Sequence, residues 1–209
     1  MTTQNYYPSA KQIRSSAWMS LSGKWGKFAV IYLVYTLIIA ACSMIFTPAA
    51  LILEGPLIIG LYIVATKVAE GDEDIEISDG FAGFKNFGTT CGLYLLNQLF
   101  IFLWSLLFVI PGIVQQYAYS MSYFIIEDHP EMSITEARKE SIRMMKGNKW
   151  RLFCLDFSFI GWVLLSSLTC GILMFWIMPY QLTAHAVFYQ DLKARETVTP
   201  EVDAPATEA

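Results

Sequence analysis

Long apolar stretches alternate with short polar segments along this chain, and most of the apolar stretches have the length of a membrane-spanning helix. The first of them, residues 28–46, contains no formal charge. With a rise of 1.5 Å per residue, such a helix approaches the roughly 30 Å thickness of the hydrocarbon core of a bilayer. The pattern predicts an all-α, polytopic membrane helix bundle. Its six expected transmembrane helices are about 28–46, 49–69, 90–110, 113–126, 150–168 and 172–189.

Breaks in the apolar pattern give the expected turns and kinks. Residues 113–126 would reach only about 21 Å as a helix, so this span must extend into its flanks, tilt little or sit within the bundle. Thr47-Pro48 and Pro111-Gly112 are expected turns between spans. Gly55-Pro56 and Pro179-Tyr180 interrupt two spans. Each predicts either a proline kink that neighbouring helices satisfy or a broken helix of the kind that transporters use to bind substrates.

The polar segments predict amphipathic helices on one face of this membrane domain, residues 28–190. In residues 1–27, four apolar positions recur every fourth residue, which predicts a basic helix lying on the membrane surface: Ile13, Ala17, Leu21 and Trp25. In the loop 70–88, Phe81, Phe84 and Phe87 share one helical face.

The loop 127–149 is expected to hold a helix that starts at a capping box, Ser133 to Glu136, and stops at Gly147. Its inner face would carry Ile134, Ala137, Ser141 and Met145. The composition of residues 191–209, rich in Glu, Thr, Ala and Pro, predicts a disordered cytoplasmic tail.

The composition agrees with a membrane protein, and the charge pattern orients it. Hydrophobic residues make up 55% of the chain, well above the share in soluble domains. Each cluster of basic residues adjoins an apolar span or is mixed with acids, which argues against nucleic-acid binding. With six spans, all 14 Lys and Arg residues fall on one side. Because basic residues are retained in the cytoplasm, both termini are expected there, in a multi-pass protein of the cytoplasmic cell membrane.

Several short motifs occur in the order found in one known family. They are Gly55-Pro56-Leu57, Pro111-Gly112-Ile113, Tyr119-Ser120-Met121, Met144 through Gly147-Asn148-Lys149-Trp150, and Phe159-Ile160-Gly161-Trp162. With them the chain resembles the bacterial integral membrane family called domain of unknown function 975. It is more distantly similar to the membrane domain of some glycerophosphodiester phosphodiesterases. The resemblance implies a polytopic protein of the cytoplasmic membrane without an assigned reaction, and no appended catalytic domain is expected.

Polar residues inside the predicted spans are the candidate site residues. Glu54 and Asp156 are the acids, and an acid at mid-bilayer costs about 2.5–3.5 kcal/mol on insertion scales, so such a residue often marks a functional site. Four further polar residues could line a path with them: Asn97, Gln98, Gln181 and His185. The structural alternative is that the acids are solvated near span ends and that the other four bond neighbouring helices.

A second set of candidates lies at the junction that precedes the fifth span. Lys146, Gly147, Asn148, Lys149 and Trp150 combine positive charge, a helix stop and an interfacial tryptophan. We expect them to hold the cytoplasmic face of the membrane and to serve as a docking surface.

The sequence contains no recognisable catalytic or cofactor motif. A Ser/His/Asp set, paired histidines with metal spacing and a glycine-rich phosphate loop are all missing from the pattern. We therefore expect a protein that is not an enzyme and holds no cofactor or metal. Its expected partners are the lipid bilayer and other membrane proteins or itself, and it would act through partner or lipid contacts on the cytoplasmic face. The alternative function is a small-solute or lipid carrier that uses the polar residues inside the membrane.

Overall fold

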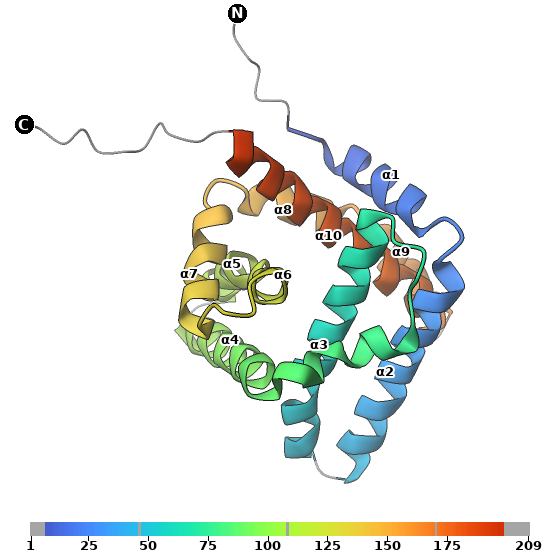
Figure 1. Ribbon diagram of the computed structural model, residues 1–209, viewed down its shortest axis with the longest axis horizontal. Helices are drawn as coiled ribbons and strands as arrows, with labels where there is room; N and C mark the ends of the chain where they lie inside the picture. The colour runs from blue at the N-terminus through green and yellow to red at the C-terminus, as the bar shows by residue number, and fades with distance from the viewer. Residues whose placement is uncertain (1–6, 46, 108, 170, 199–209) are drawn as a thin grey trace, which may run out of the picture.

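The computed structural model of the chain describes residues 7–45, 47–107, 109–169 and 171–198, and these residues form only helices and connecting turns (Figure 1). This confirms the predicted all-α class. The helices are α1 (Ala10–Leu21), α2 (Trp25–Ile45), α3 (Thr47–Glu70), the 3-10 helix η1 (Ile77–Asn86), α4 (Phe87–Leu107), α5 (Val109–Tyr119), α6 (Ser122–Asp128), α7 (Ile134–Met144), α8 (Lys149–Phe157), α9 (Ile160–Leu168) and α10 (Met174–Val198).

Four helical segments in the described part of the chain are long and apolar enough to cross a bilayer. They are Trp25–Met44, Ala50–Glu70, Ile77–Leu106 and Lys149–Leu168. The predicted fourth span is divided, because α5 ends at Tyr119 and α6 begins at Ser122. The predicted sixth span corresponds to α10, whose apolar residues are interrupted by Gln181 and His185. The count of six crossings therefore stays a prediction.

Three expectations about helix ends are wrong. Thr47-Pro48 is not a turn, since α3 already begins at Thr47. Pro111-Gly112 is not a turn, since α5 already begins at Val109. Proline is tolerated in the first turn of a helix because the backbone N–H groups there have no intrahelical partner. The predicted disordered tail begins too early, because α10 continues to Val198 and Arg195 pairs with Asp191 at 3.0 Å. Residues 199–209 lie outside the described residues.

Helix α1 has the predicted apolar face, but that face is covered by protein. Ile13, Ala17 and Leu21 are at most 3% exposed, and α1 packs mainly against α10, with further contacts to α8 and α3. The Tyr180 hydroxyl of α10 donates to the backbone oxygen of Arg14 at 3.0 Å. The face expected to lie on lipid is therefore part of the core.

The 3-10 helix η1 lies along the middle of α3 rather than in a loop beyond its end (Figure 1). Glycines make this close approach possible: a Cβ on Gly60 would overlap the Gly80 carbonyl oxygen, and one on Gly83 would overlap that of Pro56. The predicted aromatic face is present, since the rings of Phe81, Phe84 and Phe87 follow one another at 6.2 Å.

Helix α7 is the element that the sequence described best. The Ser133 side chain accepts from the Glu136 backbone, and the Glu136 side chain accepts from the Ser133 backbone, so the capping box is confirmed. Ala137, Ser141 and Met145 are fully buried. Gly147 has a φ of 81°, a left-handed conformation that suits glycine after a helix end.

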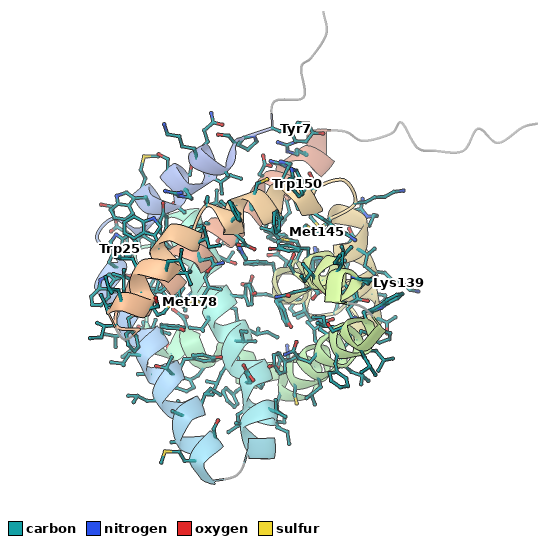
Figure 2. The ribbon with its side chains drawn as sticks, turned by 180° about the vertical axis from the view of Figure 1, so that it is seen from behind. Tyr7, Trp25, Lys139, Met145, Trp150 and Met178 are labelled. Atoms are coloured by element: carbon teal, nitrogen blue, oxygen red, sulfur yellow. The ribbon has the colours of Figure 1, made fainter. Side chains whose placement is uncertain are left out.

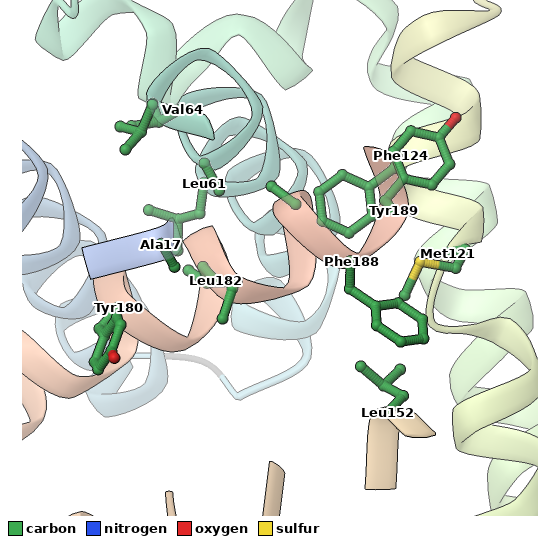
Figure 3. Packing of buried hydrophobic residues seen from close by; sticks show 14 of the residues in the cluster. Ala17, Leu61, Val64, Met121, Phe124, Leu152, Tyr180, Leu182, Phe188 and Tyr189 are labelled. Carbon is green, nitrogen blue, oxygen red and sulfur yellow. The ribbon is translucent and has the colours of Figure 1, made fainter. Parts of the chain in front are cut away.

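The hydrophobic core is centred on α10. In Figure 3, Phe188 of α10 lies between Met121 and Leu152, and all three side chains are fully buried. The neighbouring Tyr189 stacks on Phe124 of α6 with ring centroids 5.1 Å apart. Helix α10 thus joins α6 and α8 to the α1, α2 and α3 side of the molecule.

Substitution of Gly60 by alanine tests the contact between α3 and η1. The added methyl group meets backbone rather than a flexible side chain, so we expect the Gly60→Ala variant to lose about 1–3 kcal/mol or more of its free energy of unfolding. Thermal unfolding of the purified protein in detergent measures the loss. The matched control is Gly161→Ala, since a Cβ on Gly161 in α9 would have nothing within 4 Å. Equal unfolding midpoints for the two variants would contradict the described contact.

Candidate functional site

A polar cavity of about 280 Å³ lies among α3, α4, α5, α6, α8 and α10. Five of the six polar candidates from the predicted spans line it: Glu54, Asn97, Gln98, Asp156 and His185. The sixth, Gln181, hydrogen bonds to Asp156. Residues that are up to 131 positions apart in the sequence, from 54 to 185, are therefore gathered in one place.

Asp156 is the centre of the hydrogen bonding on one wall of this cavity. Its Oδ1 is 2.6 Å from Nε2 of His185 and accepts from Nε2 of Gln181 at 3.0 Å. The two partners stand four residues apart on α10, on the same face of the helix. Asp156 comes from α8, one residue before that helix ends at Phe157. These two bonds tie α8 to α10 and replace the water that the carboxylate would otherwise need.

Asn97 supplies an acceptor without a partner. The residue is fully buried in α4, and its Nδ2 donates to the Ser122 hydroxyl at 2.9 Å. Its Oδ1 has no hydrogen-bond partner among the described residues. Leaving a buried acceptor unsatisfied costs about 1–3 kcal/mol. Asn97 is therefore a cavity-lining residue with one acceptor that the described residues leave unused.

Glu54 is positioned by the glycine that follows it. A Cβ on Gly55 would lie 2.9 Å from the Cα atom of Cys91, so α3 and α4 approach each other closely here. This contact brings the partly buried Glu54 beside Tyr94 of α4. Glu54 forms no ion pair within the described part of the chain. It therefore adds an acid without a basic partner, among the described residues, to the cavity lining.

The sequence interpretation missed a set of tyrosines that share this cavity. Tyrosine is common at the surfaces of membranes, and nothing in the spacing along the sequence separates these residues from the other tyrosines. The structure gathers five around the polar groups: Tyr62, Tyr94, Tyr117, Tyr119 and Tyr123. Tyr62 and Tyr123 stack with their centroids 5.1 Å apart. The Tyr94 hydroxyl accepts from Nε2 of Gln98 at 3.2 Å.

Arg138 of α7 is a buried cation close to this region. It is 8% exposed, and its guanidinium carbon lies 4.1 Å from the Phe100 ring centroid and 4.5 Å from that of Tyr119. Such positions over aromatic faces are favourable for a cation. Arg138 is not among the residues that line the cavity. The charge pattern predicts only that this arginine lies on the cytoplasmic side, so its burial does not follow from the sequence.

The junction candidates 146–150 are not part of the cavity. Asn148 donates to the backbone oxygen of Met144 and accepts from Arg151 at 3.0 Å, which fixes the turn before α8. Trp150 is 71% exposed and stacks on Phe153 (Figure 2). Lys146 and Gly147 are exposed, and Lys149 is half-buried. Their predicted docking role stays a prediction.

A second polar cavity, of about 300 Å³, lies between η1, α3, α4 and α6, and Glu127 is one of its lining residues. Oε2 of Glu127 is buried without a hydrogen-bond partner in the described structure. Burial, with smaller contributions from Asp128 and Glu70, raises the pKa of Glu127 to about 7. This carboxyl group therefore changes its charge near neutral pH.

The fold and the site together define a helical membrane protein with a polar cavity in its interior. No group of three His, Cys, Asp or Glu residues in the described ranges is arranged to hold a metal ion. The chain belongs to the family described as "Protein of unknown function (DUF975)", which matches residues 7–115 and 106–196. No curated protein matches it. No solved structure matches it either.

Proposed function

We propose that this membrane protein binds a small polar solute in the cavity around Asp156 and acts as a carrier for it. One observation supports this most strongly: the cavity joins an acid hydrogen bonded to His185, a second acid without an ion-pair partner among the described residues, and Asn97, whose Oδ1 has no donor there. Residues that only held helices together would be expected to satisfy one another. Polar groups left open inside an apolar domain are what a solute site requires.

The same geometry argues for a binding role rather than a catalytic one. His185 is hydrogen bonded to Asp156, as a general base would be to its orienting acid. No Ser, Thr or Cys side chain within the described ranges hydrogen bonds to His185, so no activated nucleophile is formed. The protein is therefore proposed to work without chemistry on its solute.

The carrier function is favoured over docking on the cytoplasmic face. The docking interpretation depends on the exposed segment around Trp150. An exposed tryptophan is also usual where a membrane-spanning helix meets the lipid surface, so this exposure does not by itself favour docking. The cavity, in contrast, is lined by five of the six residues that were selected for their polarity inside the membrane, and the sixth, Gln181, hydrogen bonds to one of them.

A solute panel tests the carrier function. Purified protein in mild detergent is heated with small amines, amino acids, polyols and carboxylic acids in turn. A ligand at 100 times its dissociation constant stabilises the native state by about 2.7 kcal/mol, so at least one solute should raise the unfolding midpoint by several degrees. The same solute should exchange across proteoliposomes that contain the protein.

Two variants connect this result to the cavity. Asp156→Asn removes the charge that holds His185 and should abolish the shift. Asp128→Asn is the control, because Asp128 pairs with Lys193 at 2.7 Å outside the cavity. This variant should retain the shift of the unfolding midpoint. A panel without any shift, or equal losses in both variants, would contradict the carrier function.

We also propose that the protein lies in the bacterial cytoplasmic membrane with both termini in the cytoplasm. The contact between the two ends of the described chain supports this: the guanidinium carbon of Arg195 lies 4.0 Å from the ring centroid of Tyr7. Arg151 stacks on the same ring and pairs with Asp191 at 3.0 Å. A basic cluster thus joins the start of the chain to the end of α10, and basic segments are retained inside the cell.

Reporter fusions test this orientation. An alkaline phosphatase or fluorescent protein fused after Glu140, and another after Ala209, should both report a cytoplasmic position. The reason is that translocation of the basic clusters that flank α7, α8 and α10 is unfavourable. Phosphatase activity at either position would overturn the proposed orientation.

A further inference from the structure

We infer that the solute of this cavity is a small organic cation with an ammonium group. The inference deepens the proposed function and rests on it, because it specifies which class of polar solute the site takes. Three independent features support it: the charge of the lining residues, the aromatic rings among them and the acceptor of Asn97.

Acidic side chains outnumber Lys and Arg among the described residues that line the cavity. Glu54 and Asp156 line it, and none of the described residues that line it is Lys or Arg. His185 lies 2.6 Å from Asp156, whereas Glu54 has no ion-pair partner in the described part of the chain. A buried carboxylate is stable when a cation pairs with it. A cationic solute supplies that charge, whereas an anionic solute would be repelled.

The lining rings distinguish an organic cation from a bare metal ion. Five tyrosines share the cavity with the two acids. The faces of tyrosine rings attract ammonium groups, most strongly when the cation is desolvated. A bare metal ion instead requires several oxygen, nitrogen or sulfur ligands. The described residues offer no cluster of three acidic, His or Cys side chains for it.

The unpaired acceptor gives the site a second point of recognition. Oδ1 of Asn97 is buried and lacks a donor among the described residues. An ammonium N–H or a hydroxyl group on the solute would supply one. The cavity volume of about 280 Å³ is slightly below the range of typical ligand sites, which starts at roughly 300 Å³. The solute is therefore small.

Matched probes that differ only in charge test the inference. Choline and its uncharged carbon analogue 3,3-dimethylbutan-1-ol have the same shape, and ethanolamine and propan-1-ol form a smaller pair. Isothermal titration of the purified wild-type protein measures their affinities. At least one cation should bind about tenfold or more tightly than its neutral partner, a difference of about 1.4 kcal/mol.

Variants of Glu54 show whether the preference arises in this cavity. Glu54→Gln should lower the affinity for the cation by about tenfold and leave that of the neutral probe unchanged, because only the charged probe loses a counter-charge. Glu54→Asp keeps the charge and should retain the preference. Glu131→Gln is the control, since its side chain is 72% exposed and lies away from the cavity lining.

The outcomes of these titrations separate the cation inference from the carrier function. Equal affinities for a cation and its neutral partner would overturn the cation inference and leave the carrier function standing. Failure of both ammonium probes to bind, while another member of the solute panel still stabilises the protein, would also overturn only the inference. If no solute of any class binds, the carrier function fails as well.

Discussion

The hydrogen bonding of Asp156 to His185 and Gln181 is the interaction on which the interior of this protein depends. An ionised carboxylate that leaves water for an apolar bundle loses a large hydration energy unless other groups replace the water. Here two side chains of α10 do so, at 2.6 and 3.0 Å. The short helix α8 is thereby held against α10, the helix around which the core is built. The same arrangement leaves a cavity rather than a filled interface.

Close backbone contacts on the opposite side complete this arrangement. Helix α3 approaches α4 at Gly55 and η1 at Gly60, where no side chain could be inserted without overlap. Small residues commonly allow helices in membranes to approach each other this closely. The consequence for the site is that Glu54, next to Gly55, faces the cavity wall formed by α4. One wall therefore depends on hydrogen bonds to an acid, and the other depends on glycine packing.

Much of the fold follows from local patterns in the sequence. The capping box at Ser133 fixed the start of α7, and the periodicity of Ile13, Ala17 and Leu21 identified the buried face of α1. The sequence could not indicate what would cover that face, because a helix surface that packs on α10 has the same pattern as one that lies on lipid. The turn expected at Pro111-Gly112 failed for a similar reason, since proline suits both a turn and the first turn of a helix.

The site was predictable in part. Polarity inside apolar spans selected six residues, and the structure brings all six to one cavity or to its wall. The tyrosines and the buried Arg138 were not predictable, because aromatic belts and basic clusters at a membrane surface account for the same residue types. Only the arrangement of α4, α5 and α7 in space separates these roles.

The most direct test of a polar cavity inside the membrane domain is labelling of single cysteines by a small water-soluble thiol reagent. In a variant without the native cysteines, Ser120→Cys places a nearly isosteric thiol on the cavity wall. Leu106→Cys places one on an apolar helix surface, where the leucine is 77% exposed in the structure. In intact membranes, 2-aminoethyl methanethiosulfonate should modify position 120 and leave position 106 unmodified, because lipid rather than water covers the latter. Rapid modification at position 106, or none at position 120, would contradict the cavity as described.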